Sequence, residues 1–188
     1  MINVAIIGCG NIASVHIRSF LAFPDKCRIV ALVDIYPEKT LKLNEEFRLN
    51  AEIFESYSDL LDRKDINLVS ICTPPYTHAQ IAVDFLNAGK DVILEKPMAA
   101  SLEECDAVLE AEKESGRTLS VIAQNRFKTP IMNLKKTLDS GLIGDVVHVQ
   151  VDSFWWRGHS YTISGGAEHG RRKAADVRLI MPFITSTC

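Results

Sequence analysis

Two glycines and a carboxylate near the amino terminus have the spacing of a dinucleotide site. Gly8 and Gly10 follow an apolar run at residues 2–7, and Ala13 completes the pattern Gly-x-Gly-x-x-Ala where a helix begins. The first glycine permits a tight turn, the second lets a pyrophosphate approach the backbone, and Ala13 permits close packing of helix on strand. Asp34 ends the next apolar run, about 20 residues further on, where a carboxylate can bind both ribose hydroxyls.

The neighbours of these residues narrow the choice of cofactor. Asn11 and Ile12 lie in the turn, where the free amide groups and the positive dipole end of the helix favour a phosphate. Ile35 and Tyr36 follow Asp34, so no adjacent arginine is present to receive a 2′-phosphate. The pattern therefore predicts NAD, with NADP the less favoured cofactor. A glycine turn that serves only packing is the alternative.

Two further groups of residues follow apolar runs later in the chain. Residues 72–78 (CTPPYTH) follow the run at 66–71, and residues 95–97 (EKP) follow the run at 92–94. Open parallel sheets bind ligands beyond the carboxyl ends of their strands, so both groups are expected at one crevice. Taken singly, the prolines would only start a helix and the lysine would only be solvated. His16 is equally well explained as a helix-face residue without a role.

Apolar strands alternate with helices over the first two thirds of the chain. The expected strands are 2–7, 28–34, 52–54, 66–71, 92–94 and 119–123. The expected helices are 13–23, 37–49, 58–62, 75–89 and 101–116, the last with a capping box of Ser101 and Glu104 and a C-cap at Gly116. This alternation predicts an α/β protein with a Rossmann doubly wound parallel sheet.

The pattern changes after Asn125. A helix near residues 130–140 closes at Gly141, and apolar and polar residues then alternate over 147–153, which predicts an antiparallel strand with one wet face. We therefore expect a truncated start of an α+β antiparallel-sheet domain. The expected divisions are a dinucleotide-binding domain at 1–124, the beginning of a substrate and oligomerisation domain at 125–161, and an aberrant tail at 162–188.

The tail has no sustained strand or helix period and permits a specific explanation. A reading frame displaced by two bases from the codon of Tyr161 encodes, with allowed codon choices, YDLWWRGTWEKEGGGCTLNHAVHHIDM. Each tryptophan of that string requires a glycine as the next written residue, and Gly165, Gly166 and Gly170 provide it. We infer that the written C-terminus is a frameshift product of a longer gene; a genuine short tail is the alternative.

Together, the motifs resemble the Gfo/Idh/MocA oxidoreductases, the family of glucose–fructose oxidoreductase and inositol dehydrogenase. The likeness rests on GCGNIA, Asp34, CTPPYTH, EKPMA and NRF, and it covers residues 1–157. It implies an NAD(P)-dependent enzyme that transfers a hydride between nicotinamide C4 and a carbinol carbon of a sugar or cyclitol. It also implies that the full-length form is a homo-oligomer.

The resemblance implies roles for the matched residues. Lys96 would be the catalytic residue beside the nicotinamide, with its direction fixed by a cis peptide before Pro97. The implied cofactor-binding residues are Gly8, Gly10, Asn11, Ile12, Asp34, Thr73, Pro74, His78, Glu95, Lys96, Pro97, Asn125 and Arg126. The acid–base histidine of the family comes from the second domain, and the written tail offers His159 and His169 without the expected context. The chain as written is therefore expected to bind NAD and to turn over poorly; the alternative is a non-catalytic dinucleotide sensor of the same fold.

Composition argues against several other classes of protein. The chain has 24 acidic and 21 basic residues, a net charge of −3, so no basic excess favours nucleic acid or an anionic membrane. No apolar run approaches the roughly 20 residues that cross a bilayer. Five scattered cysteines without a CxxC pair predict reduced thiols and no metal site. We expect a cytoplasmic protein whose partner is a small sugar or polyol.

Overall fold

A computed structural model describes residues 1–150 of the chain. The chain divides into two compact units, Met1–Arg126 and Phe127–Cys188. The frameshift hypothesis for 162–188 and the predicted strand residues 151–153 lie outside the described part. Among residues 1–150, no helix is long and apolar enough to span a membrane, and no group of three His, Cys, Asp or Glu side chains could hold a metal ion.

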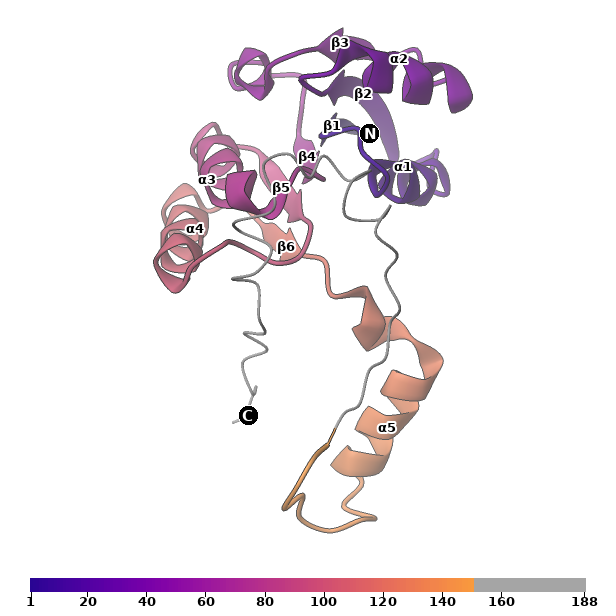
Figure 1. The fold of residues 1–188 in the computed structure, drawn as a ribbon, viewed down its shortest axis with the longest axis vertical. Helices are drawn as coiled ribbons and strands as arrows, with labels where there is room; N and C mark the ends of the chain where they lie inside the picture. The colour runs from indigo at the N-terminus through magenta and orange to yellow at the C-terminus, as the bar shows by residue number, and fades with distance from the viewer. Residues whose placement is uncertain (151–188) are drawn as a thin grey trace, which may run out of the picture. The chain divides into compact units, whose positions relative to one another are not determined.

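The first unit is built on one parallel sheet (Figure 1). Its six strands are β1 (Ile2–Ile7), β2 (Cys27–Val33), β3 (Glu52–Phe54), β4 (Leu68–Ile71), β5 (Asp91–Leu94) and β6 (Leu119–Val121). They lie in the order β3-β2-β1-β4-β5-β6, and every neighbouring pair is parallel. This is the Rossmann order, whose direction reverses between β1 and β4, and ligands of such sheets bind beyond the carboxyl ends at that point.

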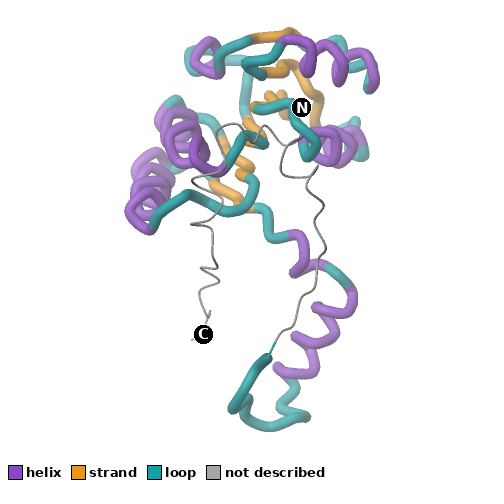
Figure 2. The backbone as a smooth tube through the Cα atoms, in the orientation of Figure 1, coloured by secondary structure: helices purple, strands orange, loops and turns teal. Residues whose placement is uncertain are grey.

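Helices flank the strands, as Figure 2 shows. The α-helices of this unit are α1 (Ala13–Leu21), α2 (Pro37–Glu46), α3 (His78–Asn87) and α4 (Leu102–Ser115), with short 3₁₀ turns η1 (Tyr57–Leu60), η2 (Pro75–Thr77) and η3 (Gln124–Phe127). The helix expected at 58–62 is present as the single 3₁₀ turn η1, and the Ser56 side chain caps its start by accepting from the Ser58 amide.

The caps of α4 confirm the sequence prediction with one difference. The Ser101 hydroxyl accepts a hydrogen bond from the Glu104 amide at 3.2 Å, and Gly116 ends the helix in the left-handed region with a φ of +63°. The Glu104 carboxylate accepts from the amide of Ala100, at 2.8 Å, one residue before the position that a capping box predicts.

Buried side chains lie on both faces of the sheet, which explains why β1 is apolar throughout. Ala5 and Ile7 belong to a core that α3 and α4 cover, whereas Val4 and Ile6 belong to a second core that α1 and α2 cover. Successive strand residues point to opposite faces, so both sets must be apolar.

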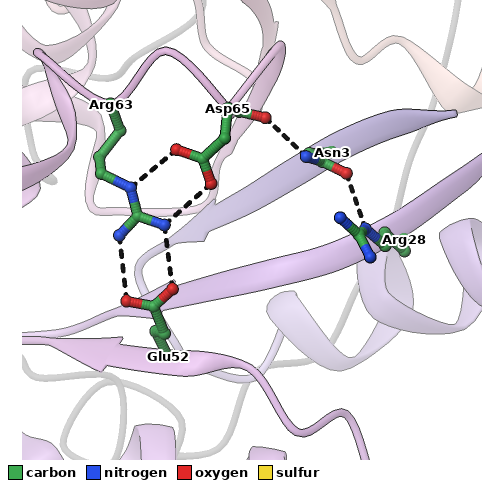
Figure 3. Close-up of polar contacts among 5 residues, drawn as sticks. All are labelled: Asn3, Arg28, Glu52, Arg63 and Asp65. Carbon is green, nitrogen blue, oxygen red and sulfur yellow. Dashed lines mark hydrogen bonds and ion pairs between the residues drawn. The ribbon is translucent and has the colours of Figure 1, made fainter.

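A polar network joins the amino ends of three strands (Figure 3). Arg63 donates hydrogen bonds to both carboxylate oxygens of Glu52 and of Asp65, at 2.8–3.0 Å. Asn3 donates to the backbone carbonyl of Asp65 and accepts from Arg28. The hydrogen bonds from Arg63 lower the pKa of Asp65 to about 2 and also lower the pKa of Glu52. This edge of the sheet is therefore tied together by side chains, and it lies opposite the predicted site.

The second unit contains α5 (Thr129–Asp139), near the helix expected at 130–140. The antiparallel strand expected from residue 147 is not formed over 146–150. A strand is stabilised by hydrogen bonds to a neighbouring strand, and the described part of this unit contains none that could pair with it.

Candidate functional site

The glycine turn after β1 is packed against the chain that follows β4. Gly8 has a φ of +89°, and a Cβ added to it would lie 2.9 Å from the carbonyl carbon of Cys72 and 2.9 Å from the amide nitrogen of Thr73. Those are backbone atoms, which cannot rotate away. Gly8 is therefore required both by its conformation and by this close approach between the two loops.

Gly10 has no such requirement from the described chain. A Cβ added to Gly10 would meet no atom within 4 Å among residues 1–150, and its φ lies outside the left-handed region. Two residues on, the N-cap residue Ile12 makes no side-chain capping bond, so the first amide groups of α1 have no side-chain partner at that position. The space beside Gly10 is consistent with an anion that approaches the backbone here.

Asp34 joins the end of β2 to the glycine turn. One carboxylate oxygen accepts from the Cys9 amide at 2.8 Å, and the other accepts from the Tyr36 amide at 2.9 Å. Lys39, which the sequence interpretation did not include, places its ammonium 3.8 Å from this carboxylate and 4.1 Å from the centre of the Tyr36 ring. Each carboxylate oxygen can accept a further hydrogen bond, so Asp34 is held in place and can still bind a hydroxyl.

Burial raises the pKa of the Cys9 and Cys72 thiols to about 12. Both residues stand beside the glycine turn, where a thiolate would be an obvious nucleophile. The raised pKa favours the protonated thiol at neutral pH, and both buried side chains pack the turn.

His78, the first residue of α3, lies between two loops of the site and is 1% exposed. One ring nitrogen lies 2.8 Å from the Thr73 carbonyl oxygen, and the other lies 2.7 Å from the Pro97 carbonyl oxygen. Carbonyl oxygens only accept, so each contact is a hydrogen bond when the nitrogen concerned carries a proton. His78 thus connects the loop after β4 with the loop after β5.

Replacing His78 with leucine is expected to lower the free energy of unfolding by about 2 kcal/mol, because a part-buried carbonyl oxygen loses its donor and the imidazole no longer joins the two loops. Urea-induced unfolding followed by circular dichroism measures this change. Gln80→Leu is the matched control, since its side chain makes only an exposed bond to Asp84 on the same helix. That control should change stability by less than about 0.5 kcal/mol. Equal losses in the two variants would contradict the connecting role of His78.

His16 belongs to a buried polar chain, and so it is more than an inert helix-face residue. One of its ring nitrogens lies 2.8 Å from the Ser70 hydroxyl, and the other lies 3.0 Å from a Glu95 carboxylate oxygen. The second Glu95 oxygen accepts from the Lys96 amide at 3.1 Å. Glu95 is 7% exposed and both of its oxygens face protein donors, so it lies inside the fold beneath the exposed Lys96. The sequence signal for these hydrogen-bonded side chains was a polar residue, His16, on the buried face of α1.

The remaining predicted residues follow the carboxyl ends of the strands. They are Asn11 and Ile12 after β1, Thr73 and Pro74 after β4, Lys96 and Pro97 after β5, and Asn125 and Arg126 after β6. The Lys96–Pro97 peptide bond is cis, as the resemblance implies. The Lys96 ammonium makes no hydrogen bond or ion pair with another residue of the described range. This edge of the sheet therefore combines a turn open to an anion, a fixed carboxylate and a free ammonium.

A cavity of about 470 Å³ lies at the opposite edge of the sheet. It is lined by residues from the amino ends of β4, β5 and β6 and from the end of α3, among them Lys64, Lys90 and Arg117. None of the predicted site residues lines this cavity. A site chosen by cavity volume would therefore lie at the amino ends of the strands, whereas parallel sheets of this kind bind ligands beyond the carboxyl ends.

Comparison with known proteins gives consistent matches. Residues 2–123 match the model GFO_IDH_MocA, described as an oxidoreductase family with an NAD-binding Rossmann fold. Inositol 2-dehydrogenase of Gluconacetobacter diazotrophicus is 36% identical over 149 residues, and that of Salmonella typhimurium is 32% identical over 149 residues. Each alignment covers 79% of this chain and 44% of the relative, so the chain spans a little under half the length of these proteins.

Two solved dehydrogenase structures also resemble the chain, each over half of its own length or less. The WlbA dehydrogenase of Bordetella pertussis, in complex with NADH and UDP-GlcNAcA, superimposes with a TM-score of 0.84 at 29% identity, over 89% of this chain and 50% of its own. Scyllo-inositol dehydrogenase of Lactobacillus casei, with bound NAD(H) and scyllo-inositol, superimposes with a TM-score of 0.71 at 25% identity, over 77% of this chain and 43% of its own.

Proposed function

Because the chain belongs to the Gfo/Idh/MocA oxidoreductase family, we propose that its first unit is the NAD-binding half of a dehydrogenase. The proposed reaction transfers a hydride between nicotinamide C4 and a carbinol carbon of a sugar or cyclitol. The observation that carries the proposal is the contrast at the glycine turn: contacts within residues 1–150 demand a glycine at Gly8, whereas the space beside Gly10 is open among those residues and fits a bound group. The substrate class is supported by the sugar nucleotide and the inositol bound by two related dehydrogenases.

The residues present fit this cofactor. The turn at Gly10 and the N-terminus of α1 would hold the pyrophosphate, because amide groups and the helix dipole favour an anion there. Asp34, already fixed by two backbone amides, would accept from the ribose hydroxyls. The loops with Thr73 and Pro74, and with Asn125 and Arg126, would line the rest of the dinucleotide, whereas the buried His78 supports the first of these loops from inside the fold.

NAD, when bound, supplies the hydride acceptor. The Lys96 ammonium would donate a hydrogen bond to the substrate oxygen, where negative charge develops as the hydroxyl proton leaves. The acid–base group that the resemblance implies lies outside the described residues, and we propose NAD binding as the function of the first unit. Turnover of a sugar and cyclitol panel by a form with a complete second domain would distinguish a dehydrogenase from a dinucleotide sensor.

The function is tested first by titrating the chain with NADH and with NADPH, using cofactor fluorescence. We expect NADH to bind more tightly, because the Asp34 carboxylate accepts from the 2′-hydroxyl and repels a 2′-phosphate. Asp34→Ser should weaken NADH binding by about tenfold, the scale of a lost charge-assisted hydrogen bond. It should bring NADPH to equal or greater affinity, since Lys39 then faces the phosphate without its carboxylate partner.

The control is Asp34→Asn, which keeps the shape and one of the two acceptor oxygens but removes the charge. It should fall between wild type and Asp34→Ser for both cofactors. No NADH binding by the wild-type chain would overturn the proposed function, whereas tighter binding of NADPH than NADH would overturn only the preference for NAD.

A further inference from the structure

We propose that His16 is a positioning residue: with Ser70 it orients the Glu95 carboxylate, which in turn holds the backbone amide of Lys96 at the site. The inference rests on the proposed function to the extent that Lys96 acts on substrate there. It assigns Glu95 the same kind of role, because both of its carboxylate oxygens are engaged by protein donors.

The chain of contacts crosses three elements that are distant in sequence. His16 comes from α1, Ser70 from β4 and Glu95 from the residue after β5. The imidazole lies 2.8 Å from the Ser70 hydroxyl and 3.0 Å from the nearer Glu95 oxygen, and all three residues are buried. These hydrogen bonds therefore connect a helix and two strands beneath the carboxyl edge of the sheet.

The chemistry of the partners assigns the direction of each hydrogen bond. The Glu95 carboxylate only accepts, so the ring nitrogen of His16 that faces it carries a proton, and the Lys96 amide donates to the other oxygen. In the neutral ring, the remaining nitrogen accepts from the Ser70 hydroxyl. Every donor in the chain then points toward the carboxylate, and no buried side-chain polar atom of the described residues lacks a partner. A fully satisfied chain of this kind fixes one geometry.

Packing alone would favour apolar side chains at these positions. Burying a carboxylate and an imidazole costs free energy that their mutual attraction only partly offsets, and an apolar trio of similar volume would be no less stable. The contribution of these hydrogen bonds is to hold the backbone amide of Lys96, which donates to Glu95. Lys96 is exposed, and its ammonium is free among the described residues.

The position of His16 also connects the two ends of the site. It lies on the first turn of α1, whose N-terminus faces the glycine turn, and its ring reaches the residue next to Lys96.

The test uses the whole chain and the backbone amide of Lys96 as its reporter. Amide hydrogen exchange by NMR is measured for the wild type, for His16→Leu, which removes both ring contacts, and for His16→Gln, whose amide can still donate to Glu95 and accept from Ser70. We expect exchange at Lys96 to rise about tenfold in His16→Leu, the scale of one lost charge-assisted hydrogen bond. Exchange at Ile6, in the centre of β1, should stay within about twofold, and His16→Gln should restore most of the protection at Lys96.

Two outcomes overturn the proposal. One is unchanged exchange at Lys96 in His16→Leu, and the other is a rise that is equal at Lys96 and Ile6, which would indicate general loosening. If His16→Leu does not fold, Glu95→Met is measured instead. That variant keeps an unbranched side chain of similar length but removes both acceptor oxygens, so unchanged Lys96 exchange in it is equally fatal. NADH titration of the same samples is independent: a wild-type chain that fails to bind NADH refutes the proposed function, while the Lys96 amide still decides the positioning role.

Discussion

Replacing Gly8 with alanine is expected to lower the free energy of unfolding by about 3 kcal/mol or more. Two costs add: about 1–2 kcal/mol for an L-residue in the left-handed region, and about 1–3 kcal/mol for a methyl group forced into a packed site. The second cost arises because the new Cβ would lie 2.9 Å from backbone atoms of Cys72 and Thr73. Urea unfolding followed by circular dichroism measures the loss.

Gly116→Ala is the matched control for this prediction. Gly116 also has a positive φ, +63°, but a Cβ there would meet no described atom within 4 Å. Only the conformational cost remains, so the expected loss is about 1 kcal/mol. If the two variants lose equal stability, the close approach between the loops after β1 and β4 does not exist in solution.

Gly10→Ala is expected to give the opposite result: nearly unchanged stability and much weaker cofactor binding. The added methyl group meets no described atom within 4 Å and the backbone is not in the left-handed region, so unfolding should change by less than about 0.5 kcal/mol. A bound pyrophosphate would be displaced from the amide groups of the turn. We expect the Kd for NADH to rise by about tenfold to a hundredfold, equivalent to about 1.4–2.7 kcal/mol.

The measurement is the NADH fluorescence titration, with Gly8→Ala measured beside it under conditions where it remains folded. Unchanged NADH affinity in Gly10→Ala would mean that the phosphate does not lie against this turn. A large loss of stability in Gly10→Ala would mean that packing within the protein requires the second glycine, and the argument for a bound group at that position would fail.

Much of the fold could be predicted from sequence because its signals are local. The apolar runs predict strands buried on both faces, and the structure confirms six parallel strands in one sheet. Ser101 and Gly116 predict the ends of α4 because the orphan amides and carbonyls of a helix are satisfied by near neighbours. The helix expected at 58–62 is only a 3₁₀ turn, and no strand is formed over the described residues 146–150, because a strand needs a partner.

The sequence by itself determined which residues could meet at the carboxyl edge of the sheet: a glycine turn, an acid after β2, and the EKP segment after β5. Strand–helix alternation permits only that placement, so spacing was sufficient. Tertiary structure alone decided how those residues are held. The contact of Gly8 with Cys72 and Thr73, and the chain from Ser70 through His16 to Glu95, join positions 54–79 residues apart, whose distances depend on strand register and helix packing. Local patterns carry no information about such contacts, because they arise only when separate elements pack.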